Sequence, residues 1–376
     1  MTTRAPVSGF AAAPFAAVRD AFVAAVESGE ELGAAFSVFV EGEEVVRLYG
    51  GYADRARETP WTEDTLACIY SSGKAAVALL MARASSEGLV DYDAPVARYW
   101  PDFAAAGKAK ITVAEALSHQ AGLAGFAEAM APEDWLDRDK IAARLAVMAP
   151  LWPPGSASGY HPQTFGFIAD EIYARATGRR IADALRADFA DAFGLRIHCG
   201  LRPVEAARTA YMPKPPRPPD LGPLTPLKEY AFLKPWSAPA RVAREAWLAA
   251  SLPASNMHAD AAALAEIVHP FAHGGRFRGR TILSADAIAA ALEERICSDD
   301  LVLPFRLSWA AGLMRNINGH FGPSPSACGH AGFGGSCVVV DPPHRLSAAY
   351  VMSRMSPHLV GDPRALRLLD VVYDAL

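Results

Sequence analysis

The sequence predicts an α/β fold of the α+β type, with helices flanking an antiparallel sheet that both ends of the chain build. Alternating or continuous apolar patterns typical of strands occur near the two termini, at 34–40, 44–49, 307–313, 337–341 and 347–352. Helical patterns fill most of the chain between them. We therefore expect the termini to close the sheet and a mainly helical domain to be inserted between them.

The expected division assigns residues 1–75 and 285–376 to the α/β domain and 76–284 to the helical domain, with approximate boundaries. The segment 213–226 contains seven prolines, which predicts a stiff, extended loop and not a helix. Two interpretations of this loop stay open. It either crosses between the domains or forms a lid over a site.

Local signals predict the helices in order. The first helix has an apolar face at helical spacing and is expected to dock on the rest of the protein through Phe15, Val18, Phe22 and Val26. The longest helix is expected to begin at Ser71 and to end at Gly88, because glycine adopts the C-cap conformation easily. Further helices are expected at 112–118, where Thr112 and Glu115 form a capping box, and at 141–148, 165–177, 181–193, 259–271 and 285–294. The last helix begins at Asp362 and Pro363, and its predicted buried face consists of Leu366, Leu369, Val372, Tyr373 and Leu376.

Composition excludes several classes of protein. Of the 376 residues, 51% are apolar and 20% are charged, which is typical of a globular chain. A net charge of −5 offers no basic field for nucleic acid, and no apolar run approaches the roughly 20 residues that span a bilayer. The odd number of cysteines, five without a C-x-x-C pair, fits reduced thiols. With no signal-peptide core near the N-terminus, these features predict a cytoplasmic protein.

The tetrad Ser71-Ser72-Gly73-Lys74 is the most informative motif. Positions i and i+3 share one face of a helix, so Lys74 is expected to reach the Ser71 hydroxyl. A desolvated lysine is able to activate a serine nucleophile, and a helix start favours developing negative charge. The alternative is that Ser71 or Ser72 only caps the helix while Lys74 is solvated.

Two later segments supply possible partners. Tyr160 follows the turn-forming run Trp152 to Gly155, and a phenol beside a lysine ammonium is expected to titrate below its usual pKa of about 10. It would then take the serine proton and return it to the leaving group. The run His330 to Ser336 places glycines before a buried strand, where the backbone can approach a substrate closely. An edge strand beside Ser71 would supply a second oxyanion N–H, which we assign to Phe333.

Taken in this order, Ser-x-x-Lys, Pro-Gly-x-x-x-x-Tyr and a final His-x-Gly strand resemble the serine β-lactamase and penicillin-binding-protein superfamily. Within it the chain looks most like the family VIII carboxylesterases, which share the class C β-lactamase fold. The resemblance implies Ser71 as nucleophile, Lys74 as its activator, Tyr160 as proton shuttle and the Ser71 and Phe333 amides as oxyanion hole. It implies a small-molecule, short-acyl ester substrate and neither metal nor organic cofactor. The expected substrate-binding residues are Trp152, His330, Gly332 and Phe333.

Two departures from the lactamase pattern favour uncharged esters over penicillins and peptides. Pro162 stands where lactamases carry the asparagine of Tyr-x-Asn, and His330 stands where they carry the lysine of Lys-Thr-Gly. A permanent cation is thus replaced by a histidine that can be neutral. The alternatives are a β-lactamase or D-amino-acid peptidase, an acyltransferase, and a catalytically silent binding protein on the same scaffold.

Two other catalytic or metal-binding motifs are not supported by the sequence, and the roles of several side chains stay open. No Gly-x-Ser-x-Gly elbow occurs, and His269 and His273 fit helix-end histidines better than a metal pair. Structural roles are favoured over pocket roles for His119 and His161. Trp152 and Phe333 are the preferred acyl- or alcohol-pocket residues among a wider apolar set that includes Phe126, Met130, Trp135, Phe232 and Trp236.

Overall fold

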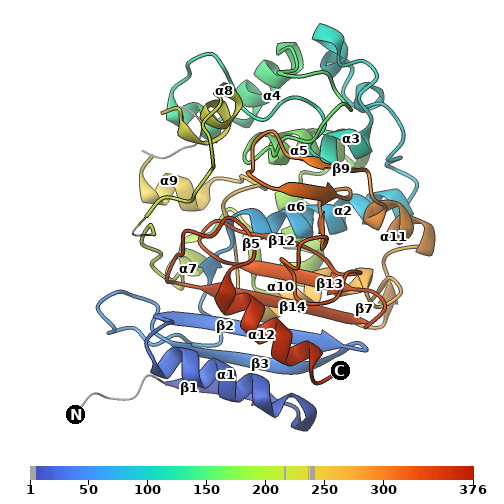
Figure 1. Ribbon diagram of the computed structural model, residues 1–376. Helices are drawn as coiled ribbons and strands as arrows, with labels where there is room; N and C mark the ends of the chain where they lie inside the picture. The colour runs from blue at the N-terminus through green and yellow to red at the C-terminus, as the bar shows by residue number, and fades with distance from the viewer. Residues whose placement is uncertain (1–5, 216, 236, 238–241) are drawn as a thin grey trace.

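Strands from the two ends of the chain pair into one antiparallel sheet, as the sequence predicts (Figure 1). The computed structural model describes residues 6–215, 217–235, 237 and 242–376, and within them this sheet has nine strands. Their order across the sheet is β1 (Val7–Ala11), β3 (Glu43–Gly51), β2 (Gly33–Val40), β14 (Leu346–Met352), β13 (Cys337–Asp341), β12 (Cys328–Ala331), β11 (Met314–Arg315), β10 (Arg306–Trp309) and β9 (Ile296–Asp299). The ends of the chain meet where β2 pairs with β14, in a register that places Phe36 opposite Tyr350.

Alternation along the central strands builds a separate core on each face of the sheet. In β14, Ala348 and Tyr350 belong to one buried cluster, while Ala349 and Val351 belong to the other. The same alternation occurs in β13, where Val338 and Val339 point to opposite clusters. A strand buried on both faces therefore reads as a continuous apolar run.

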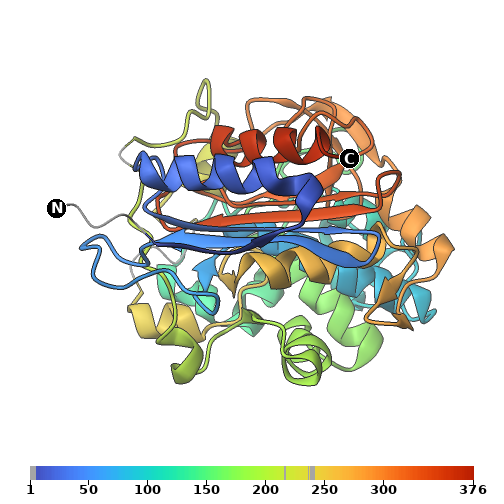
Figure 2. The ribbon, with the colours of Figure 1, turned by 90° about the horizontal axis from the view of Figure 1, so that it is seen from below.

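Helices cover both faces of the sheet (Figure 2). One face carries α1 (Ala16–Glu27) and α12 (Pro363–Tyr373), which contact each other across the two chain ends. The opposite face carries α10 (Ala261–Val268), which packs on β2 and β14. Although α10 lies inside the segment expected to form the helical domain, it belongs to the layer that covers the sheet. The domain boundaries near 75 and 284 stay a prediction.

The helical part surrounds α2 (Lys74–Ser86), which contacts α5 (Thr164–Thr177), α10 and α11 (Ala285–Leu292). Ten of the α2 side chains are buried, so this helix lies inside the protein and not on its surface. The remaining α-helices are α3 (Val113–Leu117), α4 (Arg138–Val147), α6 (Ile181–Leu185), α7 (Pro203–Ala206), α8 (Pro226–Lys228) and α9 (Arg244–Ala249). Two smaller sheets consist of β4 (Ala67–Cys68), β6 (Met257–Ala259) and β5 (Ile197–Cys199), and of β7 (Arg276–Phe277) and β8 (Arg280–Thr281).

Several local predictions are confirmed, and others are wrong. The capping box of Thr112 and Glu115 is present, and all four side chains of the predicted apolar face of the first helix are buried. The helix expected to begin at Ser71 begins at Lys74 after a 3-10 turn, Tyr70–Gly73, and α5 is longer than it. In the last helix Leu369 and Val372 are buried as predicted, whereas Leu366 and Tyr373 are only partly buried and Leu376 lies exposed beyond its end. The buried face also includes Arg364, Ala365 and Leu368. A strict apolar pattern fails there because a paired arginine occupies part of the buried face.

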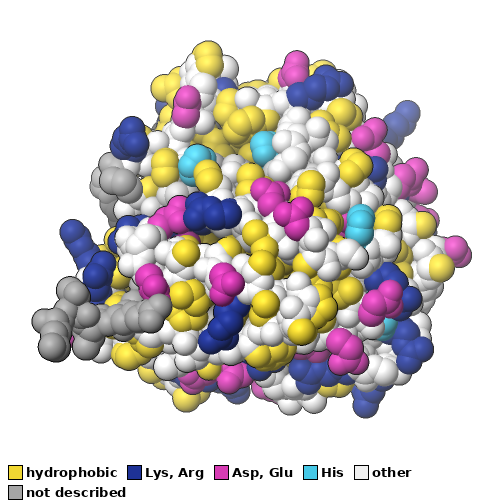
Figure 3. All heavy atoms as spheres, turned by 60° about the horizontal axis from the view of Figure 1, so that its bottom comes forward, with side chains coloured by type: hydrophobic (Ala, Val, Ile, Leu, Met, Phe, Trp, Pro, Cys, Tyr) yellow, Lys and Arg dark blue, Asp and Glu magenta, His cyan; other side chains and the backbone are white. Residues whose placement is uncertain are grey.

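Charged side chains of both signs are interspersed over the face that Figure 3 shows. This pattern agrees with the small net charge of −5. Among the described residues, no helix has the length and apolar character needed to cross a membrane.

Phe22 tests the contact between the two chain ends, because it is fully buried between α1 and the sheet. We expect Phe22→Ala to lower the free energy of unfolding by about 3–5 kcal/mol, from lost transfer energy and the cavity left behind. Denaturant unfolding of this variant beside Asp20→Ala, an exposed position on the same helix, checks the prediction. Equal stability of the two variants would contradict it.

Candidate active site

Ser71 lies in a tight turn between a short strand and a buried helix. The chain leaves β4 after Cys68 and forms the 3-10 turn Tyr70–Gly73, which continues into α2. Tyr70 adopts φ +45°, a left-handed conformation that is unfavourable for a side chain of its size. Ser71 is half-buried, whereas Ser72 is fully buried. The strained turn thus leaves one of the two serines accessible.

Lys74 is fully buried, and its Nζ atom has four oxygen neighbours. Nζ lies 2.9 Å from Ser71 Oγ and 3.0 Å from Tyr160 Oη. It also donates to the carbonyl oxygens of Pro162 and Ala254, each at 3.0 Å. Carbonyl oxygens only accept, so they take both hydrogens of a neutral amine. The lone pair of that amine is then left facing the two hydroxyl groups.

Burial also sets the charge of this amine. Desolvation lowers the pKa of the Lys74 ammonium well below its usual value. Within the described part of the chain, no carboxylate forms an ion pair with Lys74 that would favour the charged form. Burial therefore favours the neutral, proton-accepting form of this lysine more than water does.

Tyr160 completes the arrangement, since its Oη atom lies 2.6 Å from Ser71 Oγ. Its ring stacks on Trp309, with centroids 5.8 Å apart, and faces Phe232 at 6.3 Å. Burial raises the pKa of the Tyr160 phenol above its usual value. The expectation of a lowered tyrosine pKa is therefore wrong, because desolvation of the buried phenol outweighs the lowering effect of its hydrogen bond with Ser71.

A buried carboxylate holds the segment that carries Tyr160. Asp300 Oδ1 accepts the N–H of Tyr160 at 2.9 Å and those of Val302 and Leu303 at 3.0 and 2.9 Å. Its Oδ2 accepts the Ser158 hydroxyl at 2.9 Å. Sequence reasoning missed Asp300, because nothing in a pair of adjacent aspartates shows which one turns inward.

Two buried serines join the turn that carries Ser71 to β12. Ser72 Oγ donates to His330 O at 3.2 Å and lies 3.1 Å from Ser336 Oγ. Ser336 Oγ in turn donates to Ile69 O at 2.8 Å. A Cβ atom on Gly332 would lie 2.1 Å from Ser336 Oγ, so only glycine allows this close approach. The hydroxyl pair therefore fixes the end of β12 beside Ser71.

This contact brings the Phe333 segment next to the turn that carries Ser71. Phe333 follows Gly332 directly, and its ring meets Tyr70 edge-on, with centroids 5.6 Å apart. Within the described residues, the amides of Ser71 and Phe333 donate no hydrogen bond to the protein. Backbone N–H groups without a partner are the donors that an oxyanion hole requires, and the assignment of Ser71 and Phe333 to that role stays a prediction.

The three histidines near Tyr160 are all buried. His119 Nδ1 accepts the backbone N–H of His161 at 3.2 Å, and His161 Nε2 accepts that of Leu123 at 2.9 Å. These bonds agree with the structural roles favoured from the sequence. Burial lowers the pKa of both His161 and His330 to about 3, so His330 is neutral at pH 7. Its ring lies 6.0 Å from that of Tyr160.

The structure places the other pocket candidates as follows. Trp152 is buried, donates its indole N–H to Ala157 O at 3.1 Å, and packs against Gly159. Its observed contacts thus support the Tyr160 segment, and substrate contact stays a prediction. Phe126 and Trp135 are buried in the core with Met130 packed against it, and Trp236 lies outside the described residues. In the described part of the chain, no group of three His, Cys, Asp or Glu side chains is arranged to hold a metal ion.

Comparisons with known proteins agree with this geometry. The Beta-lactamase family matches residues 18–373. Esterase/beta-lactamase LipL of Mycobacterium tuberculosis is 32% identical over 371 residues, which cover 94% of this chain and 84% of that protein.

Two solved structures are similar over nearly their whole length. A penicillin-binding-protein homologue from Caulobacter crescentus is 47% identical, with a TM-score of 0.96 and coverage of 99% of this chain and 100% of the other. A family VIII carboxylesterase is 38% identical, with a TM-score of 0.93 and the same coverage. The predicted β-lactamase-like fold is thereby confirmed, and the chain belongs to the Beta-lactamase family.

Proposed function

We propose that this protein is a serine carboxylesterase that hydrolyses small, short-acyl esters through an acyl-enzyme on Ser71. The observation that carries the proposal is the hydrogen-bonded set of Ser71, Lys74 and Tyr160, in which two carbonyls occupy the amine hydrogens. Similarity to a family VIII carboxylesterase and to an esterase of Mycobacterium tuberculosis supports the same reaction class.

In the proposed acylation, the Lys74 lone pair takes the Ser71 proton as Oγ attacks the ester carbonyl carbon. The amides of Ser71 and Phe333 stabilise the negative charge that develops on the carbonyl oxygen. Tyr160 gives its proton to the leaving alcohol oxygen as the ester C–O bond breaks, and the Lys74 ammonium then reprotonates Tyr160. Every proton is accounted for, and the amine returns to its neutral form.

Deacylation repeats the sequence with water as the nucleophile. Water attacks the acyl carbon, and its proton passes through Tyr160 to Lys74. The Ser71–acyl bond then breaks, and the Lys74 proton returns to Ser71 Oγ. An alcohol in place of water would give acyl transfer, which stays an alternative because both outcomes use the same intermediate.

The surroundings of Ser71 support an uncharged substrate. Apolar rings approach the site from Tyr70, Phe232 and Phe333. His330, at the place of the lactamase lysine, is neutral at pH 7 and offers no permanent cation for a substrate carboxylate. Pro162 adds only a backbone carbonyl, which Lys74 uses. We propose the cytoplasm as the location, in agreement with five free cysteines.

The second candidate is a β-lactamase, because the printed name of the Mycobacterium tuberculosis relative includes both activities. A D-amino-acid peptidase would use the same residues. A silent binding protein is disfavoured, since Ser71, Lys74 and Tyr160 are all present and in contact.

Substitution of Ser71 by alanine is expected to abolish ester hydrolysis, because it removes the hydroxyl oxygen that attacks the ester carbonyl. Turnover of p-nitrophenyl esters of graded acyl length should fall at least about 10⁴-fold, with the native enzyme preferring short acyl chains. A chromogenic cephalosporin is assayed in parallel and should be cleaved poorly. A fluorophosphonate probe should label the native protein but not this variant.

Ser85→Ala is the matched control, because Ser85 lies near the far end of the same helix. Retained ester turnover in Ser71→Ala would show that the nucleophile is misassigned. Strong cephalosporin cleavage with poor ester turnover would identify the protein as a lactamase instead.

The pH dependence follows from the lowered pKa of Lys74. The amine must be neutral to accept the serine proton, so kcat/KM should rise with pH and reach a plateau. The midpoint should lie below the usual lysine value of 10.5, and it belongs to the coupled Lys74–Tyr160 pair. Measurement of kcat/KM between about pH 5 and 10 tests this.

Lys74→Arg is the companion variant, because a guanidinium stays protonated throughout this range. Its kcat/KM should fall at least about 10³-fold at every pH. A kcat/KM that still rises at pH 10 without approaching a plateau, or a Lys74→Arg enzyme with the native pH profile, would exclude Lys74 as the base.

Asp300→Asn should lower kcat/KM roughly 10- to 100-fold, because the amide nitrogen cannot accept the Ser158 hydroxyl and Tyr160 shifts from Ser71. The neighbouring Asp299→Asn is the control, since its carboxylate is exposed and only weakly paired with Arg306 at 3.9 Å. Steady-state kinetics of both variants test whether Asp300 positions Tyr160. Equal kinetics would show that Asp300 does not position Tyr160.

A further inference from the structure

The turn between β12 and β13 is rich in glycine and carries the Phe333 amide. Inside it, the Gly332 N–H donates to Ser336 O at 2.7 Å, and the Gly335 N–H donates to Gly332 O at 3.1 Å. Gly334 and Gly335 adopt φ values of +94° and +120°, which strongly favour glycine. Glycine leaves the backbone its greatest conformational freedom. The Gly332 carbonyl shares a planar peptide unit with the Phe333 N–H, so the Gly335 bond orients that N–H as long as Gly334 and Gly335 keep their conformation. Because both are glycines, we expect that conformation to need support from outside the turn.

That support comes from the segment leading into α12 and from its first turn. The Gly334 carbonyl accepts the backbone N–H of Ser356 at 2.9 Å and Arg364 Nη2 at 3.2 Å. Arg364 is only 8% exposed, although arginine is rarely buried. The hydrogen bond between Arg364 and the Gly334 carbonyl is therefore buried inside the protein.

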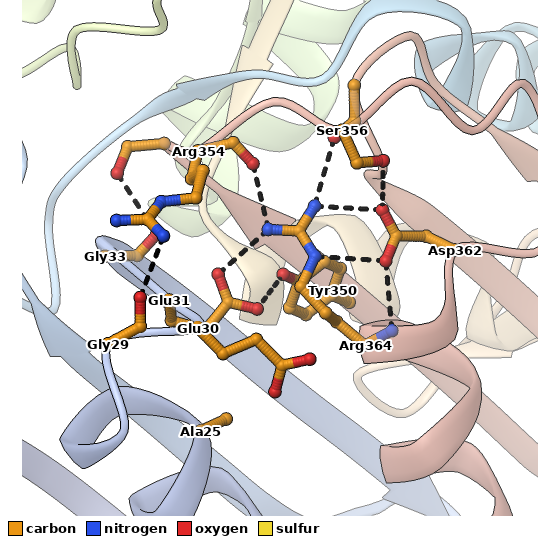
Figure 4. Close-up of polar contacts among 12 residues, drawn as sticks. Ala25, Gly29, Glu30, Glu31, Gly33, Tyr350, Arg354, Ser356, Asp362 and Arg364 are labelled. Atoms are coloured by element: carbon orange, nitrogen blue, oxygen red, sulfur yellow. Dashed lines mark hydrogen bonds and ion pairs between the residues drawn. The ribbon is translucent and has the colours of Figure 1, made fainter. Parts of the chain in front are cut away.

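All five N–H groups of the Arg364 guanidinium have an acceptor. Nε and Nη2 bind the two oxygens of Asp362 at 3.0 and 2.9 Å, in a fork (Figure 4). Nη1 binds Glu31 Oε2 at 3.1 Å and Arg354 O at 2.9 Å. The remaining Nη2 hydrogen points to Gly334 O. When four N–H groups of a planar guanidinium are bound, the direction of the fifth N–H is fixed as well.

Asp362 packs against the same turn. Its Oδ2 accepts the Ser356 hydroxyl at 2.5 Å, and its Oδ1 accepts the backbone N–H of Arg364 at 3.0 Å. A Cβ atom on Gly335 would lie 2.3 Å from Asp362 Oδ2 and 2.8 Å from Arg364 Nη2. The ion pair therefore packs directly on the backbone of the turn, two residues after Phe333.

On the basis of the proposed function, we propose that Arg364 is a positioning residue for the oxyanion hole. Its guanidinium, oriented by the fork on Asp362, holds the Gly334 carbonyl and so aims the Phe333 N–H at the reacting oxygen. Arg364 acts through the turn and does not touch the substrate. A residue at the start of the last helix thus supports transition-state stabilisation at Ser71.

Arg364→Lys tests this role, because lysine keeps the charge beside Asp362 but lacks the planar fork that also reaches Gly334. Its kcat for a p-nitrophenyl ester should fall roughly 10- to 100-fold, with KM nearly unchanged, as expected for a displaced oxyanion donor. The preference for an ester over the matching thionoester should fall as well, since sulfur is a weak hydrogen-bond acceptor. Lost stability alone would not change that preference.

Arg367→Lys is the matched control, because Arg367 lies on the same helix and pairs with Glu30 at the surface. It should keep native kcat and native ester preference. If Arg364→Lys does not fold, the double variant Glu31→Gln with Arg364→Met replaces it, since the net charge of the cluster is then unchanged. It should show the same loss of kcat and of ester preference.

The outcomes separate the two proposals when Ser71→Ala is assayed beside these variants. If Ser71→Ala is inactive but the Arg364 variants match Arg367→Lys in kcat and ester preference, the role of Arg364 is overturned and the esterase stands. If Ser71→Ala keeps native turnover, the proposed function is wrong and the positioning role falls with it.

Discussion

A lysine amine buried among neutral oxygens is the interaction on which the rest of this site depends. Lys74 is held by two backbone carbonyls and meets two hydroxyl groups, with no carboxylate partner in the described residues. A carboxylate would stabilise the ammonium form, whereas carbonyl dipoles compensate only partly for lost hydration. Burial without a carboxylate partner therefore lowers the pKa of the Lys74 ammonium. A lowered lysine pKa and a raised tyrosine pKa are the directions that the proposed role of Lys74 as base requires.

The amine has to be buried, which explains why its helix lies inside the protein. α2 is apolar along almost its whole length and is enclosed by α5, α10 and α11. One of the two carbonyls, that of Ala254, comes from a segment 180 residues away in the sequence. The surroundings of this amine are therefore assembled by contacts between distant segments of the chain, and not by the Ser-x-x-Lys tetrad alone.

Buried polar side chains that each bind several partners hold the loops around Ser71. Asp300 binds three backbone N–H groups and one hydroxyl beside Tyr160, and Arg364 uses five donors beside the glycine turn. Ser72 and Ser336 connect the turn that carries Ser71 with the turn between β12 and β13. Burying such groups is costly unless each finds a partner, so a complete set of partners also fixes one geometry.

The sequence by itself determined the layered fold and the proximity of Ser71 and Lys74, because these depend on alternation along strands and on local spacing. The pairing of Tyr160 with Lys74, 86 residues apart, was expected only from the resemblance of the motifs and their order to a known family. Sequence patterns did not reveal Asp300, Ala254 or Arg364. Only the tertiary structure decided which charged side chains turn inward and which carbonyls face Nζ. It also reversed the expected direction of the tyrosine pKa. Burial and partner choice are properties of contacts between distant segments, and a local pattern of residues carries no record of them.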